Sequence, residues 1–147
     1  NNWYNGHHKE YAGQLTSGSF IYTNTNGDTF TNAVPSGDTI AFPLDFDTLT
    51  KSVAQTLTWQ GLPLSVDQHV GFFVGTPTGG QNALFFNASN GGTDVVLGVN
   101  QKSNLALGNA TFFMDRSTAK NVVEGTSKGG RIRYRYRCTN VSGVVEN

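Results

Sequence analysis

The sequence predicts an all-β fold, most simply a Greek-key β-sandwich of immunoglobulin-like or jelly-roll type with about nine or ten strands. Charged residues make up only 14% of the 147-residue chain, whereas glycine occurs 18 times and phenylalanine 10 times. This composition disfavours helices and favours strands joined by tight turns. Short runs in which apolar and polar residues alternate, separated by glycine- and asparagine-rich turns, support the same conclusion. A closed β-barrel is the alternative.

The chain opens with strand and turn signals in regular succession. Residues 13–23 predict a strand, a short break and a second strand. Asn26 and Gly27 then give a strong hairpin-turn signal. Another turn follows at residues 33–39. This rhythm is typical of antiparallel strands with short connections.

Residues 39–50 alternate strictly and predict a further strand. One face would carry Ile40, Phe42, Leu44 and Phe46, and the other Asp45 and Asp47, as the order of the residues dictates. Pro43 has no N–H to donate, so this strand should lie at a sheet edge or contain a bulge.

The remainder of the chain continues the pattern. Residues 69–75 form a short apolar run, which predicts a strand covered on both faces. A short helical turn fits only at residues 118–130, where glycines would end it. Turns are predicted at residues 76–81 and 90–94. Further strands are predicted at residues 52–59 (with Trp59 in the core), 82–89, 95–100, 109–116 and 131–145.

The domain and charge organisation is simple. Residues 1–147 should form a single β-sandwich domain, either alone or as one domain of a larger protein. A formal net charge of zero argues against a general nucleic-acid binder, and no apolar run is long enough for membrane insertion. The charge is unevenly distributed, since residues 1–130 hold six Lys/Arg against nine Asp/Glu, whereas residues 131–147 hold four Arg against one Glu.

The excess of positive charge lies in one predicted strand, "RIRYRYRC". Because side chains of a strand alternate between its faces, one face carries the four arginines and the other carries Ile132, Tyr134, Tyr136 and Cys138. Cys138 is therefore expected to pack as a small hydrophobic residue, unless its partner lies outside the sequence given. The candidate ligand-binding residues on this strand are Arg131, Arg133, Arg135 and Arg137.

Three roles are open for these arginines. They could face the strand of Asp45 and Asp47 and neutralise it, with each pair contributing roughly 0.2–1 kcal/mol. They could be solvated and without a partner. They could bind an anionic ligand, because the planar guanidinium matches carboxylate, sulfate or phosphate with two hydrogen bonds.

A second candidate site lies near the N-terminus. Trp3, Tyr4 and Asn5 combine aromatic rings with an amide, as sugar-binding sites commonly do. Packing of Trp3 against one end of the sandwich is the alternative. The loops at residues 76–82 and 87–94 could also carry recognition, or could simply be turns.

Signatures of catalysis and metal binding are absent from the sequence. There is no nucleophile elbow, no phosphate-binding glycine loop and no His-Glu-x-x-His. The carboxylate pair Asp45 and Asp47 is compatible with glycosidase chemistry, calcium binding or a plain polar face. A zinc site made from His7 or His8, His69 and a carboxylate is a minor alternative. We expect a non-enzymatic protein without cofactor or metal.

The opening residues also resemble a known family. Trp3-x-x-Gly6 followed by Gly13-x-Leu15-Thr16 is similar to the mature start of chaperone–usher fimbrial subunits of the F4 (K88) type, over about 15 positions. The resemblance implies an extracellular protein on a bacterial surface, either a pilus subunit whose open sheet edge is completed by another chain's strand or a tip adhesin domain.

The expected function follows from these observations. The sequence and the resemblance together favour a fimbrial adhesin or pilus domain at the cell surface that recognises a host glycan or glycoprotein, with other pilus subunits as further partners. The alternative is a viral or phage structural domain, such as a capsid protruding domain or a fibre head, which serves assembly and receptor attachment.

Overall fold

The computed structural model describes residues 2–3, 6–76 and 82–147, with residues 2, 3 and 6 described by their backbone alone. The described chain is mostly β, as predicted, with one short helix. The strands are β1 (Asn2–Trp3), β2 (Gly6–His7), β3 (Ser19–Thr23), β4 (Thr29–Ala33), β5 (Thr48–Thr50), β6 (Gln55–Thr58), β7 (Gln68–Gly75), β8 (Ala83–Asn87), β9 (Asp94–Leu97), β10 (Gly108–Asn121), β11 (Arg131–Arg137) and β12 (Val141–Glu146), and the helix is α1 (Val99–Lys102).

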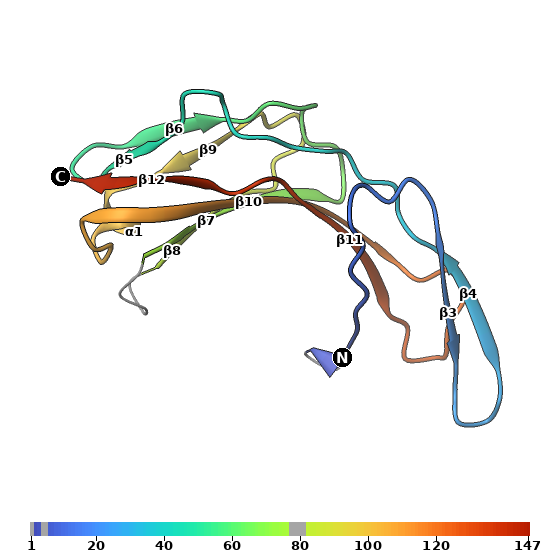
Figure 1. Ribbon diagram of the computed structural model, residues 1–147. Coiled ribbons are helices and arrows are strands. Elements are labelled where there is room, and N and C mark those ends of the chain that lie inside the picture. The colour runs from blue at the N-terminus through green and yellow to red at the C-terminus, as the bar shows by residue number, and fades with distance from the viewer. Residues whose placement is uncertain (1, 4–5, 77–81) are drawn as a thin grey trace.

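Six strands form one large, curled sheet (Figure 1). Its order is β5-β12-β10-β7-β8, and β11 pairs with β10 beside β12. The pairing of β5 with β12 is parallel, whereas the other pairings in this sheet are antiparallel. The large sheet is therefore mixed rather than purely antiparallel.

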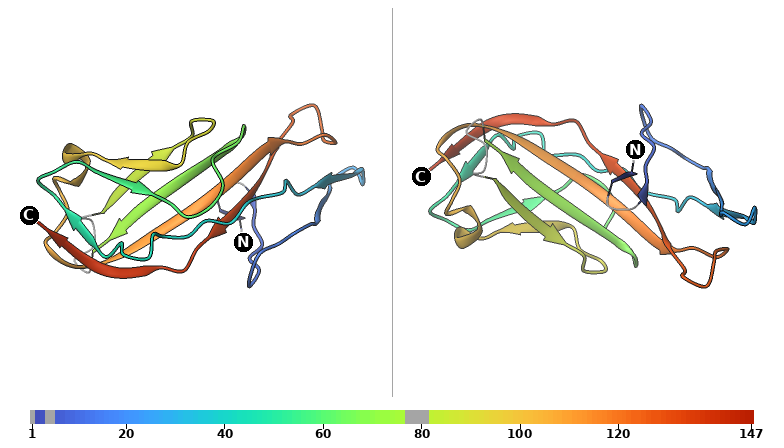
Figure 2. Two further views of the ribbon diagram at one scale, coloured as in Figure 1. Left: turned by 90° about the horizontal axis from the view of Figure 1, so that it is seen from above. Right: turned by 90° about the horizontal axis from the view of Figure 1, so that it is seen from below.

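The 14-residue strand β10 is the axis of the large sheet. On one side it pairs with β7 over eight positions, and on the other it pairs first with β12 and then with β11 (Figure 2). Its core-facing positions are Ala110, Phe112, Met114, Arg116 and Thr118, all of them buried. The alternation fixes the register, because a slip by one residue would turn this whole set to the opposite face.

A second layer covers one face of the large sheet. The two-stranded sheet β6–β9 lies on this side, and Leu57, Val95 and Leu97 project from it into the core. They meet side chains from the large sheet that are 0% exposed, namely Val70, Phe72, Val74, Phe85 and Phe112. Phe72 makes ring contacts with Phe85 and Phe112 at centroid distances of 5.7 and 5.8 Å. Each such side chain contributes about 1.5–3 kcal/mol by burial, so this cluster supplies the main driving force for folding.

The hairpin β3–β4 extends beyond the large sheet (Figure 1). The hairpin β3–β4 is attached to the turn after β10, because Asn32 Oδ1 accepts the backbone N–H groups of Val123 and Glu124 at 2.7 and 2.9 Å. Asn32 Nδ2 also donates to the Glu124 carbonyl at 2.7 Å. These bonds satisfy a buried amide and hold the hairpin against the turn.

Several predictions about individual elements are confirmed. The segment 131–137 is a strand, its arginines are exposed, and Tyr134 and Cys138 are buried. Trp59 is 4% exposed and lies in the core. The turn at Asn26 and Gly27 joins β3 to β4, and Gly27 has a φ of 88°, a conformation that favours glycine.

The predicted strand over residues 39–50 is wrong for most of its length. Within this range, the only named strand is β5, while Ala41 forms an isolated bridge to Gln60. The N–H of Phe46 donates to the carbonyl of Pro43 at 3.3 Å, so the chain turns there instead of extending. Leu44 is consequently 97% exposed rather than aligned with its neighbours in the core. The missing N–H of Pro43 stops the ladder, and this ends the strand rather than placing it at an edge.

Two other expectations need correction. Residues 118–121 belong to β10 and are followed by turns, and the one helix of the described chain is instead α1. The strand β7 is covered on one face alone, because Phe73 is 36% exposed between two fully buried neighbours. The described residues also form twelve strands rather than nine or ten, since several are only two to four residues long.

Candidate functional site

The face of the large sheet that points away from β6 and β9 is here called the outer face. Its side chains come from the strand positions that alternate with the core positions, and the registers align them in rows across β8, β7, β10 and β11. The outer face has two distinct parts. One end carries the arginines of β11, and the other carries exposed aromatic and aliphatic side chains.

The first part is the arginine row, defined as Arg131, Arg133, Arg135 and Arg137. All four side chains are exposed, and they follow one another along β11 at every second position. Arg131 donates to the carbonyl of Ala119 at 3.4 Å. Among the described residues, Arg133 has no hydrogen bond or ion pair. The row therefore concentrates positive charge and keeps part of it available.

The acid that partners the row is Asp115 of β10. Its Oδ2 lies 3.2 Å from Arg137 Nη2 and 3.9 Å from Arg135 Nη1. Gly71 lies opposite Asp115 on β7 and adds no side chain to the outer face beside the carboxylate. One carboxylate facing four guanidinium groups leaves a clear excess of positive charge.

The predicted pairing of the arginines with Asp45 and Asp47 is wrong. The neighbour of β11 in the sheet is β10, and the two aspartates lie at the turn and segment before β5, which pairs with β12. The acid that β10 does supply, Asp115, comes from a strand that the sequence alone did not place beside the arginines. Internal neutralisation of the row is therefore partial.

The second part of the outer face is an apolar patch of Phe73, Leu84 and Phe86. Leu84 and Phe86 are 62% and 58% exposed on β8, and Phe73 is 36% exposed on β7. The ring of Phe73 lies 5.7 Å from that of Phe113 on β10, and Phe113 in turn lies beneath the guanidinium of Arg137 at 5.9 Å. Phe113 thus connects the apolar patch to the arginine row through a cation–π contact.

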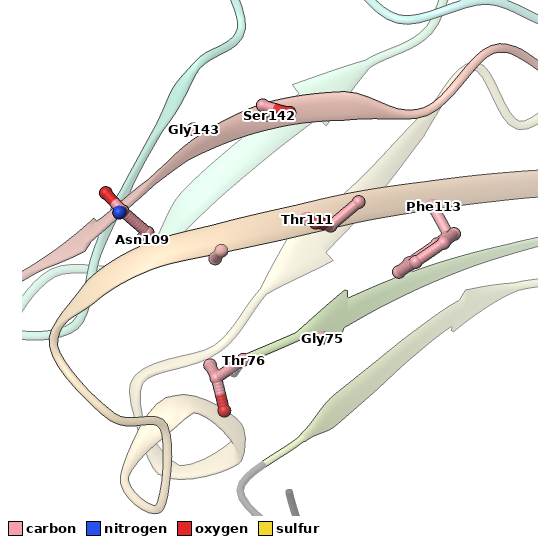
Figure 3. A pocket seen from close by; sticks show the side chains of 8 residues that line it. Gly75, Thr76, Asn109, Thr111, Phe113, Ser142 and Gly143 are labelled. Atoms are coloured by element: carbon pink, nitrogen blue, oxygen red, sulfur yellow. The ribbon is translucent and has the colours of Figure 1, made fainter. Parts of the chain in front are cut away.

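A hollow of about 590 Å³ opens beside Phe113 where β7, β10 and β12 lie side by side (Figure 3). The side chain of Phe113 reaches from β10 toward Gly75 on β7 (Figure 3), where a Cβ would lie 3.2 Å from its ring. Glycine at this position therefore allows the ring to form one wall. The lining residues are Gly75, Thr76, Asn109, Ala110, Thr111, Phe113, Ser142 and Gly143.

The hollow combines an aromatic wall with hydroxyl and amide groups. An aromatic face can stack against the apolar side of a sugar ring, and amide and hydroxyl groups can bond its hydroxyls. Apart from Thr76, which begins the candidate loop at residues 76–82, none of these lining residues was identified from the sequence as part of a site. The alternation of residues 109–116 does place Thr111, Phe113 and Asp115 on one face, and that pattern is the signal that could have found them.

The row next to Asp115 contains His69 of β7, Ser117 of β10 and Arg135 of β11. The His69 ring packs against Phe86 with a centroid distance of 5.0 Å. The pKa of His69 is lowered, first by burial and then by the positive charges of Arg133 and Arg131, against which Asp115 acts. At neutral pH the imidazole is therefore uncharged and can donate one N–H.

The N-terminal candidate residues are described in part only. Tyr4 and Asn5 lie outside the described residues, and Trp3 is described by its backbone in β1. The chain that follows passes near the arginine row, because Glu10 interacts electrostatically with Arg135 and Arg137. Its pKa is lowered, chiefly by a hydrogen bond with His8 at 3.1 Å, and the two arginines add to this effect.

Two buried cations lie on the core side of the sheet and were not predicted. Arg116 is 1% exposed and donates to the carbonyls of Leu62 and Pro63 at 2.6 and 2.8 Å and to the side chain of Gln68, with Asp38 at 3.1 Å. Its position in the alternating pattern, two residues after Met114, is a signal that it faces inward. These bonds join the segment before β7 to β10, which is a structural role.

Lys102 of α1 is the second buried cation. Its ammonium is 0% exposed and donates to the carbonyls of Thr50 and Val53 and to Gln55 Oε1. Burial lowers its pKa. No acid is among these partners, so three neutral acceptors hold the group in place and close the loop between β5 and β6.

The described side chains offer no metal-binding cluster and no activated thiol. Across residues 2–3, 6–76 and 82–147, no group of three or more His, Cys, Asp or Glu side chains could hold a metal ion. Cys138 is buried, its thiol donates to the Met114 carbonyl at 3.4 Å, and burial raises its pKa. A thiol in this state is a poor nucleophile. In the same part of the chain, no helix is long and apolar enough to span a membrane.

Comparison of the chain with protein-family models, with curated proteins and with solved structures gives no match. The resemblance to fimbrial subunits therefore stays a prediction from the N-terminal residues. The function has to be argued from the outer face itself.

Proposed function

We propose that this chain is a non-enzymatic extracellular domain that recognises acidic glycans of a host cell surface. The observation that carries the proposal is the position of the exposed arginine row next to a hollow walled by an aromatic ring. Arg137 contacts Phe113 at 5.9 Å, and Phe113 lines the hollow, so the two features are continuous. The hollow would take a sugar ring, and the row would take its acidic substituent.

The charge of the outer face supports an anionic ligand. A row of four arginines faced by Asp115, with Glu10 nearby, keeps a net positive charge. Exposed pairs of this kind contribute only about 0–1 kcal/mol to stability, so stabilising the fold gives little reason for four arginines in a row. Guanidinium groups also bind sulfate or carboxylate through two parallel hydrogen bonds.

The shape of the site supports binding rather than catalysis. The hollow is open, and the described residues that line it include neither a carboxylate pair nor a thiol, imidazole or metal-ligand cluster. Asp45 and Asp47 are adjacent to strand β5 rather than on the outer face. Surface attachment through a loop-free sheet face would then be the role of the domain, as in an adhesin or a pilus subunit of fimbriae.

The proposal extends to the fold. The large sheet and the small sheet β6–β9 face each other as two layers. This arrangement supports the proposal that the fold is a variant of the Greek-key sandwich, of immunoglobulin-like or jelly-roll type, in which one layer is reduced to two strands. Strand β12, which joins β5 in parallel, is the feature that departs from a purely antiparallel sandwich.

A glycan array tests the function directly. The purified, folded chain should bind a set of sulfated or sialylated glycans and should bind their neutral parents much more weakly. Circular dichroism on the same sample establishes that the protein is folded. A flat response across the array from folded protein would overturn the proposal.

A second candidate function is supported by the apolar patch. Leu84 and Phe86 lie on β8, whose five residues carry no charge, so two copies of this strand could meet without repulsion. The chain would then be a structural domain that self-associates, as in a viral or phage protruding domain or fibre head. Light scattering should show an oligomer that Leu84→Lys dissociates and that Ser52→Lys, at an exposed bend, leaves intact. A monomeric wild-type chain would contradict this alternative.

A further inference from the structure

One row of the outer face brings three hydrogen-bonding side chains together from three adjacent strands. Ser117 is the register partner of Arg135 on β11 and of His69 on β7. Directly opposite side chains on one face of a sheet have Cβ atoms about 4.5–5.5 Å apart. The three polar groups are therefore neighbours across the sheet.

The hydroxyl of Ser117 is buried without a hydrogen-bond partner in the described part of the chain. The residue as a whole is 1% exposed. A buried hydroxyl without a partner costs about 1–3 kcal/mol, and such groups are rare in folded proteins. A ligand that accepts a hydrogen bond from this hydroxyl would remove this cost.

The charges around the row select the kind of ligand. Arg133, one position along β11, has no ion pair in the described part of the chain, and Arg135 holds Asp115 at the long distance of 3.9 Å. Donors thus outnumber acceptors here, and the ligand group must be an acceptor with negative charge. Arg135 is 45% exposed, so its long side chain can move aside to admit such a group.

We infer that Arg133, Arg135, Ser117 and His69 form a subsite for a tetrahedral oxyanion, a sulfate or phosphate ester. Donors that converge from three strands suit three oxygens at tetrahedral angles better than the two coplanar oxygens of a carboxylate. The inference rests on the proposed function in one respect, because it takes the ester to be a substituent of the bound glycan.

His69 gives the subsite a spectroscopic probe. The groups that face it are Arg133 and Arg131, Asp115, and the ring of Phe86. Burial and the two arginines hold its pKa below the ordinary value of 6.5. A bound oxyanion offsets the positive charge of the arginines and accepts a hydrogen bond from the imidazolium, so binding should raise the pKa of His69.

The test is a titration of the folded chain with inorganic sulfate, followed through the His69 ring signals in NMR spectra. The His69→Gln variant identifies these signals among the three histidines. Chloride at matched ionic strength controls for screening. Sulfate should give a saturable shift and a higher His69 pKa. Phosphate should do the same, whereas acetate should act much more weakly.

Ser117→Ala separates the subsite from general attraction to positive charge. Sulfate affinity should fall by about ten-fold or more, since one hydrogen bond to a charged acceptor is lost. The stability of the variant should be equal or higher, because the unpartnered hydroxyl is removed. Ser52→Ala, in the exposed bend before β6, is the matched control and should leave both quantities unchanged.

Arg133→Ala should abolish the saturable shift. An absent sulfate-specific shift, or equal sulfate affinities in Ser117→Ala and the wild type, would overturn the inference.

The result can be told apart from a failure of the proposed function. Sulfate binding at His69 with a flat glycan array would support the subsite and remove the glycan as its ligand. Glycan binding that is insensitive to Ser117→Ala and silent at His69 would support the proposed function and remove the subsite. Binding of acetate as strongly as sulfate would also overturn the choice of a tetrahedral oxyanion.

Discussion

Arg116 and the arginine row lie on neighbouring strands but in opposite environments. Arg116 pairs in register with Tyr136, between Arg135 and Arg137, yet its side chain is 1% exposed on the core side of the sheet. Its guanidinium donates to carbonyls and a side-chain amide, whereas the row lies in solvent. The comparison teaches that the fold uses the buried arginine as an internal donor, whereas the four exposed arginines are only partly engaged by Ala119 and Asp115.

The strongest way to break this comparison is to remove the buried guanidinium. Arg116→Met should lower the free energy of unfolding by about 3 kcal/mol, because the carbonyls of Leu62 and Pro63 and the Gln68 side chain lose their donor. Chemical denaturation measures the change. The same replacement at Arg133 is the control and should cost less than about 0.5 kcal/mol. Equal losses of unfolding free energy in the two variants would contradict the assignment of Arg116 to the fold and of Arg133 to ligand binding.

Lys102 tests whether buried cations in general serve the fold. Lys102→Met should destabilise by roughly 2 kcal/mol, since three acceptors around the loop between β5 and β6 lose their donor. Lys120→Met, at an exposed position of β10, is the matched control. If Lys102→Met unfolds at the same denaturant concentration as the wild type, the network around Lys102 has no stabilising role.

Removing the charge of Asp115, the acid that partners the arginine row, should strengthen ligand binding rather than destabilise the fold. Asp115→Asn should strengthen binding of an acidic glycan about three- to ten-fold, because Arg135 and Arg137 lose their internal anion. Stability should change by no more than about 1 kcal/mol, as expected for an exposed ion pair. Asp45→Asn makes the same charge change away from the outer face and should leave affinity unaltered. Weaker binding by Asp115→Asn would mean that the aspartate itself contacts the ligand.

The smallest expected effect concerns Cys138, the buried residue that directly follows β11. Because burial raises the pKa of the Cys138 thiol above its ordinary value of 9.0, the folded state holds its proton more tightly than the unfolded state. The stabilisation is complete below that value and is lost as the pH rises through the folded pKa. Above pH 9, Cys138→Ala should therefore lose stability less steeply than the wild type. Parallel stability curves over this range would show that the thiol has the same pKa in the folded and unfolded states, and would contradict the effect of burial.

Local alternation made part of this structure predictable. The strand "RIRYRYRC" needed no knowledge of its neighbours, because period two alone separates the arginines from Tyr134 and Cys138. The same rule failed at residues 39–50, where the pattern is equally regular but Pro43 ends the extended chain. A regular pattern thus identifies a strand only where the backbone can also form its ladder.

The composition of the site could not be predicted, because it depends on long-range pairing. Asp115, Ser117 and His69 become neighbours of the arginines through the registers of β7, β10 and β11, and β7 is far from the other two strands in the sequence. The hollow depends likewise on the closeness of Gly75 on β7 to Phe113 on the adjacent strand β10. The arginines were identified from sequence, whereas their partners required the sheet order.

The most direct test of the central claim is a paired measurement on Arg133→Ala combined with Arg135→Ala. For an acidic glycan that the wild type binds on the array, we expect binding to be abolished while the melting temperature stays within about 2 °C. Lys120→Ala combined with Lys128→Ala removes the same charge from exposed positions elsewhere and should bind as the wild type does. A large drop in melting temperature with glycan affinity intact would contradict the claim and assign the row to the fold.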